Sequence, residues 1–268
     1  MKFLRTRGLP PLLLSSFGAA VALVLPAWAL ADEPAGDGMS PAASGSSSWA
    51  LGVAIGISQR PYRDADNKTL ALPLLMYENR WVRFGGTGLD LKLPSAGPVS
   101  FALRARYSFD GYDADDAPIL NGMEDRKSSF WLGGAARWHN PVVDVSAEWV
   151  GDASSHSKGQ QFKLVLERGF RAGAFEFTPR LGASWLDRKY VDYYYGVTAA
   201  EVRADRPFYE GKSTVNAEVG LRTVYGLAPR HALTLDLSTT RLGSAIQDSP
   251  LVGRRNVSSA RFGYVYRF

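Results

Sequence analysis

The sequence predicts an antiparallel transmembrane β-barrel of about 12 strands, and three observations favour that fold. Segments of roughly 10 residues alternate bulky apolar side chains with small or charged ones, which is the period of a strand with two different faces. Tryptophan and tyrosine recur at the ends of these segments, where a membrane interface favours them. The connections are alternately short and long, as in barrels whose long loops all lie on the outer side of the membrane.

Residues 1–31 are predicted to be a cleaved secretory signal peptide. Lys2, Arg5 and Arg7 form a basic start, an apolar run follows, and Ala29-Leu30-Ala31 offers the small residues of a cleavage site. The run is too short to span the roughly 30 Å hydrocarbon core of a bilayer. The mature chain is therefore expected to be exported from the cytoplasm.

The next segment, residues 32–48, reads DEPAGDGMSPAASGSSS and has no periodicity. Such a composition cannot bury enough apolar surface to offset the entropy of ordering, so we expect a flexible periplasmic arm. Residues 49–268 then form a single barrel domain. The chain has no cysteine, so neither disulfides nor thiol chemistry are expected, and no dense stripe of lysine and arginine indicates a nucleic-acid partner.

The strands are expected to have one bulky and one small or charged face. In Trp49–Ser58, large residues alternate with alanine, glycine and serine, and a second segment carries Leu70, Leu72 and Leu74 on one face. We expect the bulky face of each segment to contact lipid and the opposite face to look into the lumen. A soluble β-sandwich would place the same faces the other way round. The strand length, the aromatic strand ends and the terminal Phe268 favour the barrel.

The stretch Asn79–Leu93 can be one strand or a short hairpin that turns at Gly85-Gly86. A single strand would put the long connection Asp110–Ser128 on the periplasmic side. With the hairpin, every long connection lies outside and both ends of the barrel lie in the periplasm. We therefore expect the hairpin and an even number of strands.

The last strand carries aromatic residues on one face up to the final position, namely Tyr264, Tyr266 and Phe268. A terminal aromatic residue on an amphipathic last strand resembles the signal that the outer-membrane barrel assembly machinery reads. We therefore expect this machinery, together with outer-membrane lipid, among the partners of the chain.

Charged residues on the face opposite the bulky one define the expected lining of the lumen. Unpaired charge away from water is costly, so these side chains should pair across strands or contact water. They could line a channel or form a packed, ion-paired interior that conducts little, and the small diameter of such a barrel favours the second interpretation. The residues are Arg104, Arg106, Arg137, Asp144, Glu148, Lys163, Glu167, Glu176, Arg180, Glu218, Arg222, Asp236, Arg261 and Arg267.

Two outer connections carry further candidates. Tyr193, Tyr194 and Tyr195 could form a contact patch for a partner or glycan, or an aromatic rim on lipid headgroups, and the sequence leaves both open. His156, in a serine-rich connection, would suit an outer-rim lipid hydrolase, but no GxSxG elbow accompanies it. No catalytic, cofactor-binding or metal-ligating residue is therefore expected.

Five segments share their pattern with a known group of proteins. The more specific ones are Tyr194-Tyr195-Gly196-Val197 and Asp248-Ser249-Pro250-Leu251-Val252. The segments Trp49–Ser58, Pro73–Glu78 and Gly263–Phe268 extend the likeness over almost all of the mature chain. On these residues the chain resembles the MipA/OmpV family, the MltA-interacting proteins of the outer membrane.

The resemblance implies an outer-membrane barrel that acts as a scaffold in peptidoglycan (murein) metabolism. It also implies that the barrel joins a lytic transglycosylase to a bifunctional penicillin-binding protein, and it brings no catalytic residues with it. We therefore expect a non-enzymatic scaffold or anchor in the Gram-negative outer membrane, without a cofactor. A narrow porin-like channel for small solutes is the alternative, and an outer-rim lipid hydrolase is a second one.

Overall fold

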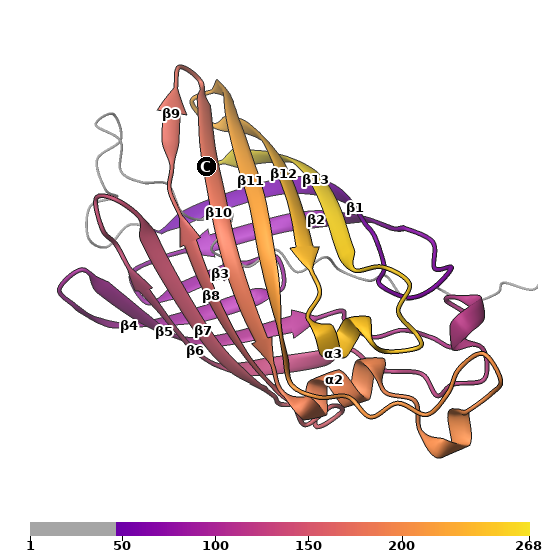
Figure 1. The fold of residues 1–268 in the computed structure, drawn as a ribbon. Coiled ribbons are helices and arrows are strands. Elements are labelled where there is room, and N and C mark those ends of the chain that lie inside the picture. Colours follow the sequence, from indigo (N-terminus) through magenta and orange to yellow (C-terminus); the bar gives the residue numbers. More distant parts are fainter. Residues whose placement is uncertain (1–46) are drawn as a thin grey trace, which may run out of the picture.

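The computed structural model describes residues 47–268, which form one closed antiparallel β-barrel (Figure 1). β8 (Gln160–Glu167) and β9 (Phe170–Ala172) pair along the same edge of β10 (Phe175–Leu186), so they act as one interrupted strand and the barrel has 12 strand positions. The expected fold class is confirmed. The signal peptide and the arm up to residue 46 lie outside the described residues. The other strands are β1 (Ser48–Ser58), β2 (Lys68–Glu78), β3 (Val82–Gly85), β4 (Gly88–Ala96), β5 (Val99–Ser108), β6 (Ser129–Trp138), β7 (Asp144–Asp152), β11 (Thr214–Ala228), β12 (His231–Arg241) and β13 (Asn256–Arg267).

The weak stretch before β5 is the expected hairpin of β3 and β4. Its tip is a two-residue turn, Gly86-Thr87, closed by the pair Gly85 and Gly88. Gly86 has φ +58°, a value that residues with a side chain rarely adopt and that hairpin turns of this length require. With this hairpin the long loops all lie at one end of the barrel (Figure 1), as expected from the alternation of short and long connections. These loops are residues 59–67, 109–128, 153–159, 187–213 and 242–255.

The hairpin is short, and this leaves a notch in the wall. Only Met76–Glu78 of β2 pair with β3. In the described part of the chain, residues 68–75 have no strand partner on that side. The wall beside β2 is therefore held only by β1 over most of its length.

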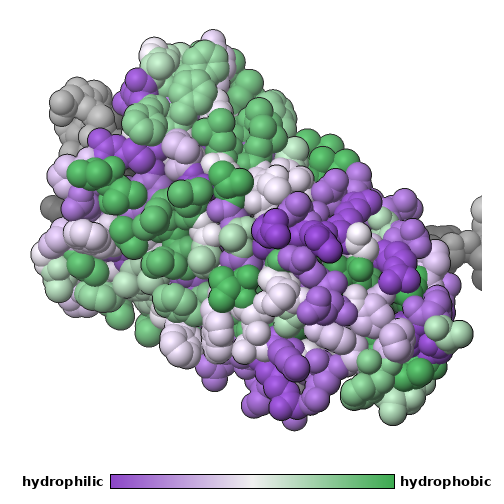
Figure 2. All heavy atoms as spheres, viewed as in Figure 1, coloured by the Kyte–Doolittle hydropathy of each residue, from purple (hydrophilic) through white to green (hydrophobic). Residues whose placement is uncertain are grey.

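On most strands the bulky face turns outward, as expected. Val53 is 61% exposed, Leu132 54% and Leu181 59%. Figure 2 shows apolar side chains gathered over the barrel wall and hydrophilic side chains over the loop end. This distribution is what a barrel wall in contact with lipid requires.

The expectation was wrong for β2, whose leucine face turns inward. Leu70 is 8% and Leu74 3% exposed, whereas Leu75 on the other face is 42% exposed. Both faces of β2 are apolar, so the alternation alone does not decide between them. The register decides: Leu74 lies opposite Gly52 of β1, and the small inward residues of β1 leave space that the leucines fill.

The loops at the outer end contain helices and form a cap over the barrel. They include α2 (Arg188–Tyr195), α3 (Ser244–Gln247) and the 3₁₀ turns η1 (Pro118–Leu120) and η2 (Ala199–Glu201). Asp187 begins α2, because its Oδ1 accepts a hydrogen bond from Tyr190 N at 2.8 Å. Across residues 47–268, no helix combines the length and the hydropathy needed to cross a bilayer.

Candidate functional site

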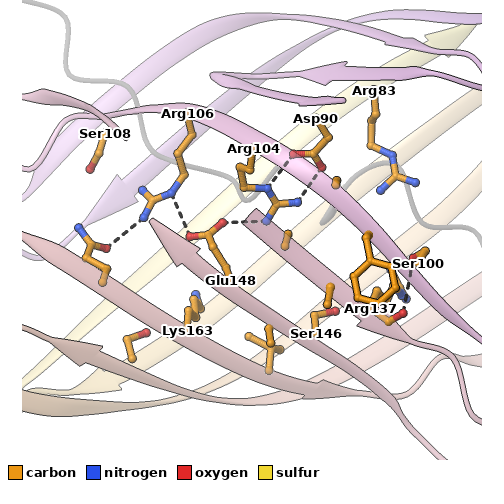
Figure 3. A pocket seen from close by; sticks show the side chains of 18 of the residues that line it. Arg83, Asp90, Ser100, Arg104, Arg106, Ser108, Arg137, Ser146, Glu148 and Lys163 are labelled. Carbon is orange, nitrogen blue, oxygen red and sulfur yellow. Dashed lines mark hydrogen bonds and ion pairs between the residues drawn. The ribbon is translucent and has the colours of Figure 1, made fainter. Parts of the chain in front are cut away.

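The lumen wall formed by β4 to β8 carries a chain of charge-assisted hydrogen bonds (Figure 3). Arg104 donates from Nε to Asp90 Oδ1 and from Nη2 to Asp90 Oδ2, at 2.7 Å each. Its Nη1 donates to Glu148 Oε2 at 2.7 Å, and Arg106 Nε donates to Glu148 Oε1 at 3.1 Å. Arg106 Nη2 also donates to Gln161 Oε1 at 3.0 Å. Two parallel bonds between a guanidinium and a carboxylate fix both groups, so ion pairs order this side of the lumen.

The strand register brings these partners together. Asp90 of β4 lies directly opposite Arg104 of β5, and Glu148 of β7 lies opposite Lys163 of β8. Side chains in directly opposite positions share one face of the sheet, with Cβ atoms about 5 Å apart. Asp90 and Arg104 pair directly in this way, whereas Glu148 reaches past β6 to Arg104 and Arg106 of β5.

A second network is centred on Asp236 of β12, which is 5% exposed. Arg180 donates to its carboxylate from Nη1 at 2.6 Å and from Nη2 at 3.0 Å. Arg222 Nε lies 3.7 Å and Arg261 Nη1 3.5 Å from the same carboxylate. Arg180 Nε also donates to Glu218 Oε1 at 2.9 Å. One buried carboxylate thus lies within ion-pair distance of three guanidinium groups, which come from β10, β11 and β13.

Further pairs lie toward the periplasmic end. Arg137 Nη2 lies 3.0 Å from Asp144 Oδ2 and 3.3 Å from Glu167 Oε1. Glu176 Oε2 accepts from a guanidinium of β9 at 3.2 Å, and Arg267 lines a hollow beside it. Every charged residue expected in the lumen lies on the face opposite the exposed bulky side chains, and each is at least partly buried.

Asp90 and Gln161 are central to the first network, and the sequence analysis missed both. Asp90 alternates with Leu89 and Leu91, both of which are exposed, so it carries the same signal as the strands that were recognised. The signal was overlooked because the surrounding hairpin looked irregular. Gln161 is uncharged, and a search for charged alternation does not find it.

A cavity of about 530 Å³ occupies the lumen beside the first network. At its outer end it is bounded by Leu186, Tyr190 and Tyr195. At its other end it reaches Ser95 and Ser100, which are exposed near the periplasmic turns. The cavity therefore meets the cap on one side and approaches the periplasm on the other.

The cap is locked by a buried ion pair between two loops. Arg126 Nη2 donates to Glu201 Oε1 at 2.9 Å and to Oε2 at 3.0 Å, and the two side chains are 7% and 5% exposed. Burial alone would raise the pKa of Glu201, but backbone hydrogen bonds from Thr198 and Glu124, together with Arg126, more than offset it and lower that pKa. Arg206 Nη1 donates to Ile119 O at 2.6 Å and ties the same two loops together.

Packing beneath this lock closes the outer end of the lumen. Trp131 and Ile246 belong to one apolar cluster, and Leu120 and Leu251 belong to a second, and all four are 0% exposed. These residues come from β6 and from the loops at 109–128 and 242–255. The two clusters therefore fill the outer mouth with side chains that water does not reach.

The three-tyrosine patch expected on α2 is not a surface patch. Tyr194 is 1% exposed, and its hydroxyl donates to Lys127 O at 3.0 Å. Tyr195 faces the lumen cavity and stacks at 5.9 Å, between ring centroids, on Tyr62. The hydroxyl oxygen of Tyr193 accepts a hydrogen bond from Lys127 N at 2.9 Å. The helix turns these rings inward because they fill the barrel mouth, which the sequence of a long loop does not reveal.

His156 lies at the outer end, as expected, but its ring faces a buried group. Its Nδ1 is 3.3 Å from Ser129 Oγ and 3.0 Å from Ser128 O. Ser129 is 0% exposed, so a lipid substrate has no access to that hydroxyl. Within residues 47–268, no group of three or more His, Asp or Glu side chains is arranged to hold a metal ion.

The aromatic end of β13 lies on the outer surface at the periplasmic end. Phe268 is 65% exposed and meets Tyr266 edge to face, with ring centroids 5.0 Å apart. The hydroxyl oxygen of Tyr264 lies 2.6 Å from His231 Nδ1. The aromatic face is thus accessible along the seam where β13 pairs with β1 and β12.

Comparison with known proteins agrees with this architecture. "Putative outer membrane protein YiaT" of Escherichia coli K12 is 26% identical over 231 residues, covering 85% of this chain and 94% of that protein. "MltA-interacting protein" of the same organism is 25% identical over 224 residues, covering 82% and 90%. An outer membrane channel from Pseudomonas putida F1 has a similar fold, with a TM-score of 0.42 and 11% identity over 86% of this chain and 100% of the other.

The profile of a protein family, described as MltA-interacting protein MipA, matches residues 51–268. This range includes the whole barrel except the first residues of β1. The chain is an outer-membrane β-barrel that belongs to the MltA-interacting protein family.

Proposed function

We propose that this chain is a non-enzymatic barrel that anchors or scaffolds peptidoglycan-remodelling proteins at the outer membrane. The observation that carries the proposal is the closed outer mouth, where Trp131, Leu120, Ile246 and Leu251 are 0% exposed. A barrel that is sealed by packed side chains does not serve as an open conduit. Of its remaining accessible surfaces, the periplasmic end is the one that faces the peptidoglycan.

The relatives suggest which partner would use the periplasmic end. One relative at 25% identity is named MltA-interacting protein, and that name supports a lytic transglycosylase as the partner of this chain. A penicillin-binding protein is the second partner that the family resemblance implies. The periplasmic turns offer exposed apolar side chains for such contacts, including Trp81 at 56% and Val142 at 76% exposure. The arm at residues 32–48 would add to the same surface.

A pull-down from detergent-solubilised envelopes tests the scaffold. The barrel with and without residues 32–48 is used as bait, and a lytic transglycosylase and a penicillin-binding protein are detected by immunoblot. The double variant Trp81→Ser and Val142→Ser should recover less of either enzyme. Phe208→Ser is the matched control, because Phe208 is 60% exposed but belongs to the outer cap. Equal recovery by both variants, or recovery of neither enzyme by the unaltered chain, contradicts the proposal.

A narrow porin-like channel is the second candidate, and the cavity of about 530 Å³ in the lumen favours it. Planar-bilayer recordings of the refolded barrel separate the two. The scaffold proposal expects no conductance steps. Reproducible steps that change in amplitude with Glu148→Gln would support the channel, because Glu148 lies at the cavity wall.

The aromatic residues Tyr264, Tyr266 and Phe268 are proposed to act as the assembly signal. Phe268 is exposed and the two tyrosines are half-buried on the outer surface at the seam of the barrel, which supports this role. Phe268→Ala should lower the amount of folded barrel in the outer membrane. Phe170→Ala serves as the control, since Phe170 is 55% exposed near the periplasmic end but is not part of the last strand. Equal levels of the two variants would remove the assigned role.

A further inference from the structure

More cationic than anionic side chains line the lumen cavity. Its lining includes seven Arg or Lys and four Asp or Glu side chains. The acidic groups are already engaged: Asp90 by Arg104, Glu148 by Arg104 and Arg106, and Glu218 by Arg180. The fourth, Asp110, accepts from a serine hydroxyl. Three carboxylates behind the lining pair with its cations as well, Glu78 with Arg83 and Lys92, and Asp144 and Glu167 with Arg137. The groups that face the cavity directly are therefore mostly positive, although neighbouring carboxylates balance much of their charge.

Three side chains at the cavity carry donors that their partners among the described residues do not fully use. Gln161 accepts from Arg106 through Oε1, and its Nε2 is buried without a partner. Arg83 Nη2 donates to Glu78 at 3.1 Å, but Arg83 Nε is buried without a partner. Lys163 Nζ lies 3.4 Å from Glu218 Oε2, and its side chain is 27% exposed. Buried donors without partners are costly, and a rotation of the Gln161 or Arg83 side chain toward the cavity would let a bound oxyanion accept from them.

Figure 3 shows how these groups surround the space. Arg83 lies near the Asp90 end of the chain formed by Asp90, Arg104 and Glu148, and Lys163 lies near its Glu148 end. Hydroxyl groups, among them those of Ser95 and Ser146, also line the cavity. A volume of about 530 Å³ lies within the range of small-molecule pockets.

The route into the cavity is from one side only. The cap closes the outer end with Tyr190 at 7% and Tyr194 at 1% exposure. The opposite end reaches Arg80 and Ser100, which are exposed. We propose that the lumen is a blind binding site for a small organic polyanion, bearing carboxylate or phosphate groups, that enters from the periplasm and does not pass through the barrel.

Isothermal titration of the folded, processed chain in a neutral detergent tests this site, with citrate as the probe and sucrose as an uncharged solute of similar size. Citrate should bind with a 1:1 stoichiometry and more weakly at high salt, and sucrose should not bind. Inorganic phosphate should compete with citrate. The measurement contains no partner protein, so its failure is separate from a failure of the pull-down.

Two substitutions remove positive charge and leave the acidic neighbour paired. After Lys163→Gln, Glu218 still accepts from Arg180, and after Arg83→Gln, Glu78 still pairs with Lys92. Each should weaken citrate binding on the order of tenfold, the loss expected for one charge-assisted hydrogen bond. Lys163→Arg keeps the charge and should retain binding.

Arg188→Gln is the control for a lost charge elsewhere, because Arg188 lies in the outer cap with a side chain that is 67% exposed. It should bind citrate as the unaltered chain does. Heat-modifiable migration on gels verifies that each variant is folded. Three results would overturn the proposal: no citrate binding by the unaltered chain, equal binding by the folded Gln variants, or a steady citrate current across a planar bilayer.

Discussion

Asp236 is the residue whose loss most directly tests whether the lumen is a packed, ion-paired interior. It receives two hydrogen bonds from Arg180 and lies within 3.7 Å of Arg222 and 3.5 Å of Arg261. The substitution Asp236→Asn keeps the shape of the side chain and removes its charge. Three guanidinium groups would then remain close together, with Glu218 as the acidic partner left to Arg180.

The expected cost follows from the burial of this group. Removing one partner from a buried ion pair costs about 3–5 kcal/mol, because the other charge stays buried without compensation. Asparagine still offers a carbonyl oxygen to Arg180, so we expect the lower end, about 3 kcal/mol. The exposed pair of Arg188 and Glu210 provides the comparison, with side chains 67% and 51% exposed. Its loss through Glu210→Gln should cost less than about 1 kcal/mol.

Urea unfolding of the refolded barrel in phospholipid vesicles measures both costs, with tryptophan fluorescence as the signal. Asp236→Asn should lower the unfolding midpoint clearly, and Glu210→Gln should leave it nearly unchanged. If the two variants unfold at the same urea concentration, water screens the charges around Asp236. The lumen would then be hydrated and open, and a closed interior would no longer support the proposal that the barrel is an anchor.

Three further substitutions test other parts of the structure. Gly220→Val should displace Arg180, because a Cβ at Gly220 would lie 2.6 Å from Arg180 Cζ. In urea it should destabilise the barrel about as much as Arg180→Ala, and the double variant should be no less stable than either single variant. The lowered pKa of Glu201 means that its pairing with Arg126 stabilises the cap above the ordinary glutamate pKa of about 4.3 and is lost as the pH falls through the lowered value. Protease resistance of the outer loops should therefore decrease on acidification, and Glu201→Gln should show low resistance already at neutral pH. Gly52→Val should reduce the yield of folded barrel on gels, because a Cβ at this position would lie 2.1 Å from a backbone oxygen of β13.

The period of two predicts the faces of most strands because one face is apolar and the other is small or charged. For β5, Leu103 and Arg104 leave no ambiguity, and the structure places the first outside and the second inside. For β2, Leu74 and Leu75 are equally apolar, so the pattern does not distinguish the two faces. The choice depends on the neighbour in space, Gly52 of β1, which the pattern of a single strand does not contain.

The cap was beyond sequence analysis for a different reason. Its lock joins Arg126 to Glu201, two residues from separate loops that are 75 positions apart. Loops have no periodic pattern that would reveal such a contact. The sequence pointed to many of the charged residues that face the lumen, since each belongs to an alternating strand, but it missed Asp90. It did not identify which of them pair, because pairing across the barrel depends on strand tilt and side-chain length.

The closed mouth depends on α2, and the contacts of α2 indicate a fixed plug. Tyr194 donates to Lys127 O, and Tyr193 O accepts from Arg126 Nε at 2.8 Å, so the loop at 109–128 holds the helix from one side. Asp192 Oδ1 accepts from Gly211 N at 2.8 Å, which closes the helix against the end of its own loop. Opening a path to the exterior would require all of these contacts to break together with the packing around Trp131. A gate needs two arrangements of similar free energy, and a helix anchored at this many points has one strongly preferred arrangement. Since the lumen then ends at α2, a solute that enters it from the periplasm can bind there but has to return to the periplasm.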